Sequence, residues 1–287
     1  MKEDGFMLKK ILLTLFIILI LAVLIQLFLI TGTKGQALQK DNLRSDVKYS
    51  PTPTLLIPGW AGNALTYAKL IHYYQKENIA QKTMTVHVSP TGKIHVSGTV
   101  AGKKNALIQV IFDWNYTKNY LPQVTWLTNI MKVLHHQYGV TKLNVVAHSW
   151  GGTAWIHAVA NSRYIQKNIT FNKVILLGVP INESFSNKIS FLEALKKKTT
   201  DKNYFRLVKK LKKFDPQKMI HFYNIMGTKS DVKASDGSVP HVQSEFLKTV
   251  LKDDWSTYHQ VIYQNTTHSG LHESKKVLNK LASVLWE

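Results

Sequence analysis

A serine between a buried strand and a helix is the residue of this sequence best suited to chemistry. Ser149 lies in the string Ala147-His148-Ser149-Trp150-Gly151, after a short β-branched apolar run and before a segment of helical composition. The tight turn of a nucleophile elbow requires very small residues two positions before and two positions after the serine, and Ala147 and Gly151 meet this requirement. We therefore predict that Ser149 is a nucleophile.

A serine hydroxyl is a poor nucleophile at neutral pH, so an imidazole must take its proton and a carboxylate must orient that imidazole. His268 is the predicted base, with His272 as an alternative. Asp236 is the predicted acid, and Asp231 is an alternative because both aspartates follow the same predicted strand. The spacing of the two histidines lacks a His-Glu-x-x-His string or a third ligand, so we expect no metal and no other cofactor.

The oxyanion that develops during acyl transfer needs backbone N–H donors. The N–H of Trp150, next to the predicted nucleophile, is one candidate. The N–H of Trp60, directly after Pro58-Gly59 and the first predicted strand, is the other. Alternatively, the glycines of this loop only turn the chain and the tryptophans only pack.

The elements that must position these residues alternate between strands and helices. This alternation predicts an α/β fold, with a mostly parallel sheet flanked by helices and right-handed crossovers. Serine after one strand, aspartate two strands later and histidine after the last strand is the chain order of α/β-hydrolases. The predicted strands cover 55–57, 82–88, 93–96, 106–112, 142–147, 173–177, 219–226 and 258–263, and the main helices cover 63–77, 121–138 and 274–285.

Residues 181–218 interrupt this alternation. They carry 11 Lys or Arg against four acidic residues, and their apolar residues recur at helical spacing. Tyr204, Leu207, Val208 and Leu211 share one side of a predicted helix. We predict a small helical cap insertion above the strand ends, which either rests on an anionic membrane, gates the pocket or is an ordinary surface helix.

Residues 11–30 form an uncharged run long enough to cross a bilayer as a helix. The run exceeds the apolar core of a typical signal peptide, so we favour a transmembrane anchor, or an uncleaved signal, over a cleaved one. Residues 1–10 are then a cytoplasmic tail and residues 31–50 a polar linker to a domain over 51–287. Lysines lie on both sides of the run, so the positive-inside rule does not decide the orientation.

The chain carries a net charge of +20, of which residues 1–30 contribute only one unit. So basic a surface is expected to attract polyanions such as anionic lipid or wall polymer, or to be solvated without a specific partner. We expect no nucleic-acid partner, because no helix-turn-helix, zinc-finger or RNA-binding signature is present. The absence of cysteine excludes structural disulfides and permits either compartment.

Four motifs together resemble the lipase-like α/β-hydrolases known as cell-surface hydrolases of unknown function in Gram-positive bacteria. They are Leu55-Leu56-Ile57-Pro58-Gly59-Trp60-Ala61-Gly62, Val145-Val146-Ala147-His148-Ser149-Trp150-Gly151-Gly152, Ser235-Asp236-Gly237-Ser238-Val239-Pro240 and His268-Ser269-Gly270-Leu271-His272. The resemblance implies a triad of Ser149, Asp236 and His268, favours Asp236 over Asp231, and implies that the domain is extracellular. Two positions depart from the family pattern: Ala147 replaces the elbow glycine, and Pro58 stands where many relatives have histidine.

The leading hypothesis is a single-pass protein of the cell membrane that cleaves carboxylic esters with an apolar acyl group through an acyl-enzyme intermediate. An acyltransferase that uses the same three residues is a variant of this hypothesis. A hypothesis of a different class is a non-catalytic surface module that binds anionic wall polymer or lipid through its basic face.

Overall fold

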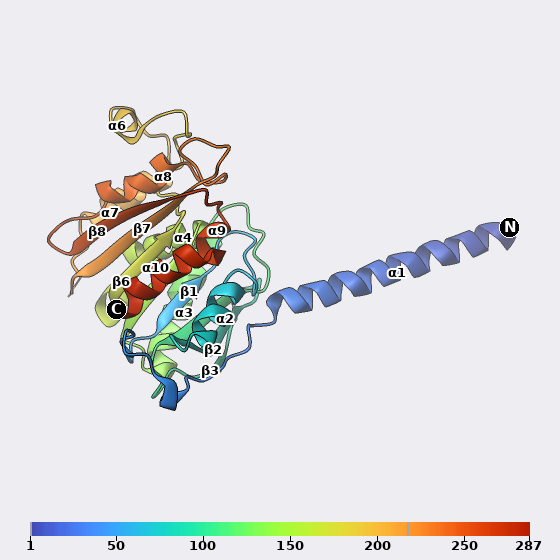
Figure 1. The fold of residues 1–287 in the computed structure, drawn as a ribbon. Coiled ribbons are helices and arrows are strands. Elements are labelled where there is room, and N and C mark those ends of the chain that lie inside the picture. The colour runs from blue at the N-terminus through green and yellow to red at the C-terminus, as the bar shows by residue number, and fades with distance from the viewer. Residues whose placement is uncertain (1, 217) are drawn as a thin grey trace.

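One twisted sheet crosses the domain, and its strands follow the order β3-β2-β4-β1-β5-β6-β7-β8 (Figure 1). The computed structural model describes residues 2–216 and 218–287, and within them the sheet has eight strands. All neighbours pair in parallel except β2 and β3, which form an antiparallel hairpin. The strands are β1 (Thr54–Ile57), β2 (Gln81–Val88), β3 (Ile94–Gly98), β4 (Ala106–Phe112), β5 (Lys142–His148), β6 (Thr170–Leu177), β7 (Ile220–Thr228) and β8 (Ser256–Gln264).

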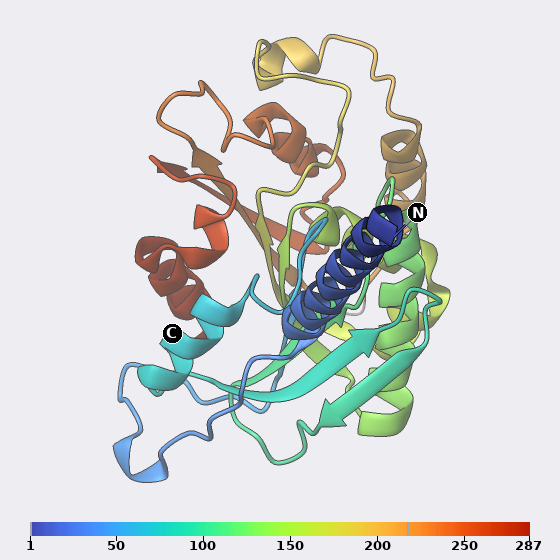
Figure 2. The same ribbon diagram turned by 90° about the vertical axis from the view of Figure 1, so that its right-hand side faces the viewer.

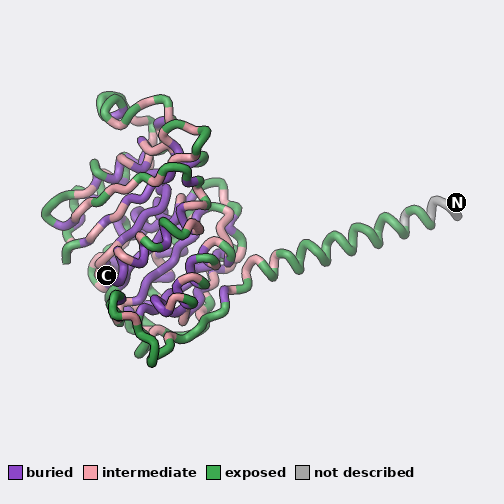
Figure 3. The backbone as a smooth tube through the Cα atoms, in the orientation of Figure 1, coloured by how far each residue is buried: buried purple, intermediate pink, exposed green. Residues whose placement is uncertain are grey.

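Helices cover both faces of the sheet. On one face, α3 (Leu121–Tyr138), α4 (Trp150–Asn161) and α5 (Arg163–Asn168) enclose a core that includes Trp155 and Leu127. On the other face, α2 (Ala68–Lys76) and α10 (Lys275–Trp286) enclose a second core. The central strands β1 and β4 are buried along their whole length, which explains their nearly continuous apolar sequence (Figure 3). The structure thus confirms the predicted α/β-hydrolase fold.

The helix α1 (Lys2–Ile30) projects away from the domain (Figures 1 and 2). Among the described residues, it contains the one segment that is long and apolar enough to cross a membrane by length and composition, Lys9–Ile30. The apolar side chains along this segment are exposed to solvent in the isolated chain. A helix that is apolar on every face is more stable in the hydrocarbon of a bilayer than in water.

Residues 31–50 pack against the domain instead of bridging a gap to it, which corrects the prediction of a linker. The backbone N–H groups of Thr33, Gln36 and Gln39 donate to the side-chain carbonyls of Gln109, Gln75 and Asn78, at 2.8 to 2.9 Å. Lys48 N–H donates to the carbonyl of Trp286. The buried amide side chains of the domain thus hold the segment, including its short 3-10 helix η1 (Lys40–Asn42), in place.

The predicted cap region contains two helices, α6 (Phe191–Ala194) and α7 (Lys202–Leu211). Tyr204, Leu207 and Leu211 of α7 are buried, whereas its lysines face solvent. Asp201 caps the helix by accepting from the N–H groups of Asn203 and Tyr204. Phe185 and Tyr204 pack on Phe246, so the region is fixed to the segment made of α8 (His241–Glu245) and η2 (Phe246–Thr249).

Candidate active site

Ser149 lies at the corner between β5 and α4, in a backbone conformation that few residues adopt. Its φ is 51° and its ψ is −138°. A positive φ in a residue with a side chain is strained, at a cost on the order of 1–3 kcal/mol. The Ser149 N–H donates to the carbonyl of Leu177 at 3.0 Å, which ties the corner to the end of β6. The side chain faces a pocket, and strain of this kind concentrates at functional sites.

Close contacts explain why the residues around the corner are small. A Cβ on Gly151 would lie 2.2 Å from the carbonyl oxygen of Pro58, and a Cβ on Gly59 would lie 2.7 Å from the Cβ of Ser149. The first turn of α4 therefore touches the loop after β1 directly. Ala147, which stands where relatives have glycine, is completely buried in the core between the sheet and α4, so its methyl group is accommodated.

His268, which is half-buried, and Asp236, which is buried, form a pair on the two loops that follow β8 and β7. His268 Nδ1 lies 2.7 Å from Asp236 Oδ2. The other carboxylate oxygen, Oδ1, accepts from the N–H groups of Ser238 and Val239 at 2.9 and 2.8 Å. The His268 N–H also donates to the backbone carbonyl of Asp236. Asp236 is 2% exposed, so its carboxylate is oriented away from water by three hydrogen bonds, from His268, Ser238 and Val239.

The alternative acid, Asp231, and the alternative base, His272, do not form such a pair. Asp231 is exposed and pairs with Lys229 on the surface, with 3.1 Å between Nζ and Oδ2. His272 is buried beside the pocket, and within the described chain its Nδ1 has no hydrogen-bond partner. Burial lowers the pKa of His272 to about 4, so the ring is neutral at pH 7. Thus Asp236, and not Asp231, is the carboxylate in contact with His268.

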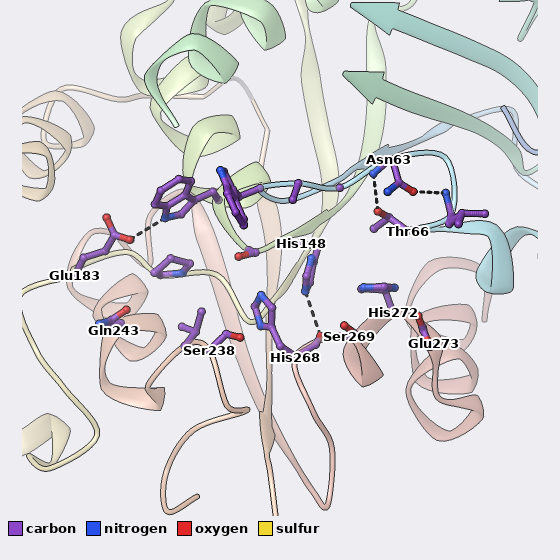
Figure 4. A pocket seen from close by; sticks show the side chains of 18 residues that line it. Asn63, Thr66, His148, Glu183, Ser238, Gln243, His268, Ser269, His272 and Glu273 are labelled. Carbon is purple, nitrogen blue, oxygen red and sulfur yellow. Dashed lines mark hydrogen bonds between the residues drawn. The ribbon is translucent and has the colours of Figure 1, made fainter. Parts of the chain in front are cut away.

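His148 fills the space between His268 and His272. Its ring centroid lies 4.2 Å from that of His268 and 4.6 Å from that of His272 (Figure 4). Its Nε2 lies 3.2 Å from the backbone carbonyl of His268. Burial, with the two neighbouring imidazoles, holds the pKa of His148 well below its usual value. A neutral His148 can donate to that carbonyl and so support the loop that carries His268.

Two backbone N–H groups, those of Trp60 and Trp150, belong to residues that line the pocket. Trp150 is the first residue of α4, and Trp60 lies in the loop after β1; both line the pocket. In the part of the chain that the structure describes, neither N–H has an acceptor among the hydrogen bonds of turns, loops and helix ends. Free N–H groups at a helix N-terminus and an adjacent loop can stabilise an oxyanion.

Asn115 fixes the loop of Trp60, a role that the sequence analysis missed. Its side-chain Nδ2 donates to the carbonyls of Gly59 and Gly62, at 2.6 and 3.1 Å, and its Oδ1 accepts from Gln123. Its backbone carbonyl accepts from the N–H of Ala61. Asn115 lies just past β4, so its position at the carboxyl end of a central strand was the one available signal.

The pocket has a volume of about 560 Å³ and opens to solvent (Figure 4). More than half of the residues that line it are polar, and Trp60, Leu65, Trp150 and Val239 add apolar surface. Trp150 Nε1 donates to Glu183 Oε1 at 2.8 Å, and burial raises the pKa of Glu183. Within the described residues, no group of three or more His, Asp or Glu side chains is arranged to hold a metal ion.

The serine and the imidazole are close but not bonded. Ser149 and His268 line the same pocket, yet among the described residues no hydrogen bond joins Ser149 Oγ to the His268 ring. Such contacts are often long in free enzymes and shorten when substrate binds. The arrangement thus has the parts of a serine hydrolase site: a strained serine, a carboxylate-bound imidazole and two free N–H groups.

The family described as alpha/beta hydrolase of unknown function (DUF915) matches residues 41–287. The chain belongs to this family. The resemblance predicted from the four motifs is therefore confirmed. The match begins within the segment 31–50, in agreement with the contacts that hold this segment to the domain.

Two solved structures show the same fold. A protein of Listeria innocua is 24% identical, with a TM-score of 0.70, over 82% of this chain and 93% of the other. A candidate cell surface hydrolase from Lactobacillus plantarum is 21% identical, with a TM-score of 0.61, over 80% of this chain and 88% of the other. At these identities the likeness shows the fold alone. A comparison with curated protein sequences found no match.

Proposed function

We propose that this alpha/beta hydrolase is a membrane-anchored serine hydrolase that cleaves carboxylic esters. Ser149 is the nucleophile, His268 the general base and Asp236 the residue that orients it. The observation that carries the proposal is the combination of a strained serine corner with a 2.7 Å His268–Asp236 contact beside one pocket. The fold supports it too, since this chain order of serine, aspartate and histidine serves ester hydrolysis in α/β-hydrolases.

The hydrogen bonds of Asp236 define which nitrogen of His268 is the base. Asp236 accepts from two backbone N–H groups, as a carboxylate does, so His268 Nδ1 carries the proton that it shares with Oδ2. The lone pair then lies on Nε2, which takes the Ser149 Oγ proton as Oγ bonds to the ester carbon. When the C–O bond breaks, Nε2 returns this proton to the leaving alkoxide, and an acyl-serine remains.

Water completes the cycle by the same proton transfers. It loses a proton to His268 Nε2 and attacks the acyl carbon, and Ser149 Oγ leaves as it regains that proton. In both steps the negative carbonyl oxygen accepts hydrogen bonds from the N–H groups of Trp60 and Trp150. Asn115 holds the first of these donors by fixing Gly59 and Gly62.

The pocket wall supports an ester with an apolar acyl group as substrate. Trp60, Leu65, Trp150 and Val239 supply apolar surface around Ser149. Burying apolar surface contributes about 25 cal/mol per Å², so an acyl chain gains affinity along this wall.

The helix α1 supports the anchor, because its apolar segment Lys9–Ile30 is long enough to cross a bilayer. We place the domain on the outside of the cell membrane. The name of the Lactobacillus plantarum relative, a candidate cell surface hydrolase, supports this side. In this account the basic surface contacts anionic lipid or wall polymer.

The test is hydrolysis of p-nitrophenyl butyrate by the full-length protein in detergent micelles. Ser149→Ala should abolish turnover, because no other hydroxyl occupies the corner between β5 and α4. Ser269→Ala is the matched control, since Ser269 lines the same pocket outside the triad, and it should keep turnover within about twofold of wild type. Undiminished turnover of Ser149→Ala would remove the proposal.

A further inference from the structure

The last turn of α1 is bonded directly to the loop after β1, which lines the pocket, and to the loop after β4, which lies beside it. Gln26 Nε2 donates to the carbonyl of Asp113 at 2.6 Å, and the carbonyl of Leu29 accepts from the N–H of Ala64 at 2.9 Å. Asp113 begins the loop of Asn115, and Ala64 lies in the loop of Trp60. The position of the pocket relative to α1 is therefore fixed by hydrogen bonds at both loops, not left to a flexible linker.

These contacts define the depth of the pocket relative to a bilayer. The uncharged run 11–30 is about 30 Å long as an α-helix, which equals the thickness of the hydrocarbon core. Ile30 is then at the membrane boundary on the domain side. Gln26 precedes Ile30 by about one helical turn, roughly 6 Å. Because Gln26 contacts Asp113, the loop that begins there starts within about one helical turn of that boundary, on its hydrocarbon side.

Three large aromatic side chains are exposed on these two loops. Trp60 is 52% exposed, Trp114 52% and Tyr116 48%. Their rings contact one another in series: the ring centroids of Trp60 and Tyr116 are 6.0 Å apart, and those of Tyr116 and Trp114 are 5.2 Å apart. We call these three residues the aromatic rim. Exposed aromatic clusters are rare on soluble surfaces, whereas Trp and Tyr concentrate at membrane interfaces.

The rim is continuous with the pocket. Trp60 belongs to both, since it lines the pocket and its Nε1 donates to the carbonyl of Thr117 at 2.9 Å, which joins the two loops. Lys34 and Lys118 are exposed next to α1 and the rim in the sequence, and each adds the positive charge that attracts anionic headgroups. Trp60 thus joins the aromatic rim to the pocket that holds Ser149.

We propose that the aromatic rim inserts into the membrane interface and that the pocket receives its ester from the bilayer, so that the substrate class is membrane lipids with a carboxylic ester. This inference rests on the proposed function, since it requires both the anchor and the hydrolase. The lipid reaches Ser149 past Trp60 without first dissolving in water. The energetic cost of extracting an acyl chain is thereby reduced, because the rim covers the chain while it enters the pocket.

Insertion of the rim can be measured without activity. The chain has no cysteine, so a dye on Trp114→Cys or Tyr116→Cys labels one position. Phe205→Cys is the matched control: Phe205 is also an exposed aromatic, 50% exposed, on α7, which Figure 1 shows on the side of the domain away from α1. In vesicles that contain the full-length protein, shallow spin-labelled lipid should quench the dyes at 114 and 116 roughly twofold or more and leave the dye at 205 unquenched. Equal quenching at the three positions would overturn the insertion.

The substrate class is tested by comparing two esters. Dioleoylglycerol is embedded in vesicles of ether-linked phosphatidylcholine, so the probe is the one ester in the bilayer, and p-nitrophenyl butyrate is the soluble ester. Trp114→Ser should lower turnover of the embedded ester by about fivefold or more and leave the soluble ester within about twofold. Phe205→Ser should change neither rate. An equal loss on both esters, or no loss on either, contradicts the role of the rim.

The two proposals fail in different ways. If the wild-type protein cleaves neither ester, the hydrolase proposal itself is wrong. If it cleaves p-nitrophenyl butyrate in a Ser149-dependent manner but leaves embedded dioleoylglycerol intact, the hydrolase proposal stands and the lipid substrate is excluded.

Discussion

Asp236 is the residue whose surroundings are most specific for one role. Its two carboxylate oxygens have different partners. Oδ1 accepts from the N–H groups of Ser238 and Val239, and Oδ2 accepts from His268. The first pair of bonds prevents the carboxylate from rotating. The third bond then selects the imidazole tautomer that leaves Nε2 free for the serine proton.

Asp236→Asn is expected to keep the shape of this site and lose its chemistry. An amide in this position can donate to His268 Nδ1, which would place the proton on Nε2 and remove the base, so turnover should fall by about 10⁴. Asp231→Asn is the control, since Asp231 is exposed and pairs only with Lys229 at the surface. The rate of ester hydrolysis is measured for both variants. A similar loss of turnover in Asp236→Asn and Asp231→Asn would show that the acid is wrongly assigned.

His157 on α4 predicts a dependence of stability on pH. Burial lowers its pKa to about 4, from 6.5 in the unfolded chain. The unfolded state therefore binds a proton first, and the free energy of unfolding decreases as the pH falls from about 6.5 to about 4. A shift of this size corresponds to about 3 kcal/mol.

Urea unfolding of the detergent-solubilised protein measures this effect. Between pH 7 and pH 4, His157→Gln should lose about 3 kcal/mol less unfolding free energy than the wild type. Glutamine keeps a group that can bond to the hydroxyl of Tyr120, which lies 3.3 Å from His157 Nε2. If the wild type and the variant lose stability in parallel over this range, His157 is not the group that titrates.

The candidate triad could be predicted from the sequence, but the residues that support it could not. Ser149, Asp236 and His268 are each marked by a short motif after a strand, so their order along the chain predicts their meeting. Asn115 and His148 act through contacts with loops that are distant in sequence, at Gly59 and at His268. No local pattern encodes such contacts, because any buried polar side chain of suitable length could make them.

At the scale of elements, the corner between β5 and α4 depends on close contact with the loop after β1. A methyl group at Gly151 would meet the backbone of Pro58, which cannot move away as a side chain can. In contrast, a methyl group at Gly270, the first residue of α9 (Gly270–Glu273), would meet only side-chain atoms of Thr266 and Thr267, at 3.2 Å or more.

Gly151→Ala should therefore lower the stability by about 1–3 kcal/mol, despite the higher helix propensity of alanine. Gly270→Ala should change it by less than about 1 kcal/mol. Thermal unfolding followed by circular dichroism compares the two. A melting temperature of Gly151→Ala equal to that of wild type would show that the elbow and the loop are not in contact.

The sequence predicted the long elements well and the short or packed ones poorly. The strand over 106–112 and the helix over 121–138 have the predicted bounds, because apolar periodicity and a terminating glycine mark them. The helices α5 and α9 were missed because they have too few residues for a period to be seen. The segment 31–50 was misjudged since its polar sequence resembles a linker, whereas buried Gln75, Asn78 and Gln109 supply its partners.

At the scale of the whole molecule, α1 lies on one side of the domain and the basic helix α7 lies on another (Figure 1). The proposed outward side of the domain can be tested on intact cells. Protease added to intact cells should digest the domain and leave a short α1 fragment, detected by an N-terminal tag. Survival of the full-length chain while an exposed control protein is digested would place the domain in the cytoplasm.

The most direct test of the account is covalent labelling of the full-length protein with a fluorophosphonate, followed by mass mapping of the modified residue. The account predicts one label, on Ser149, absent from Ser149→Ala and formed far more slowly in His268→Gln, where Nε2 of the base is lost. A folded protein that stays unlabelled, or a label on any other serine, would contradict it.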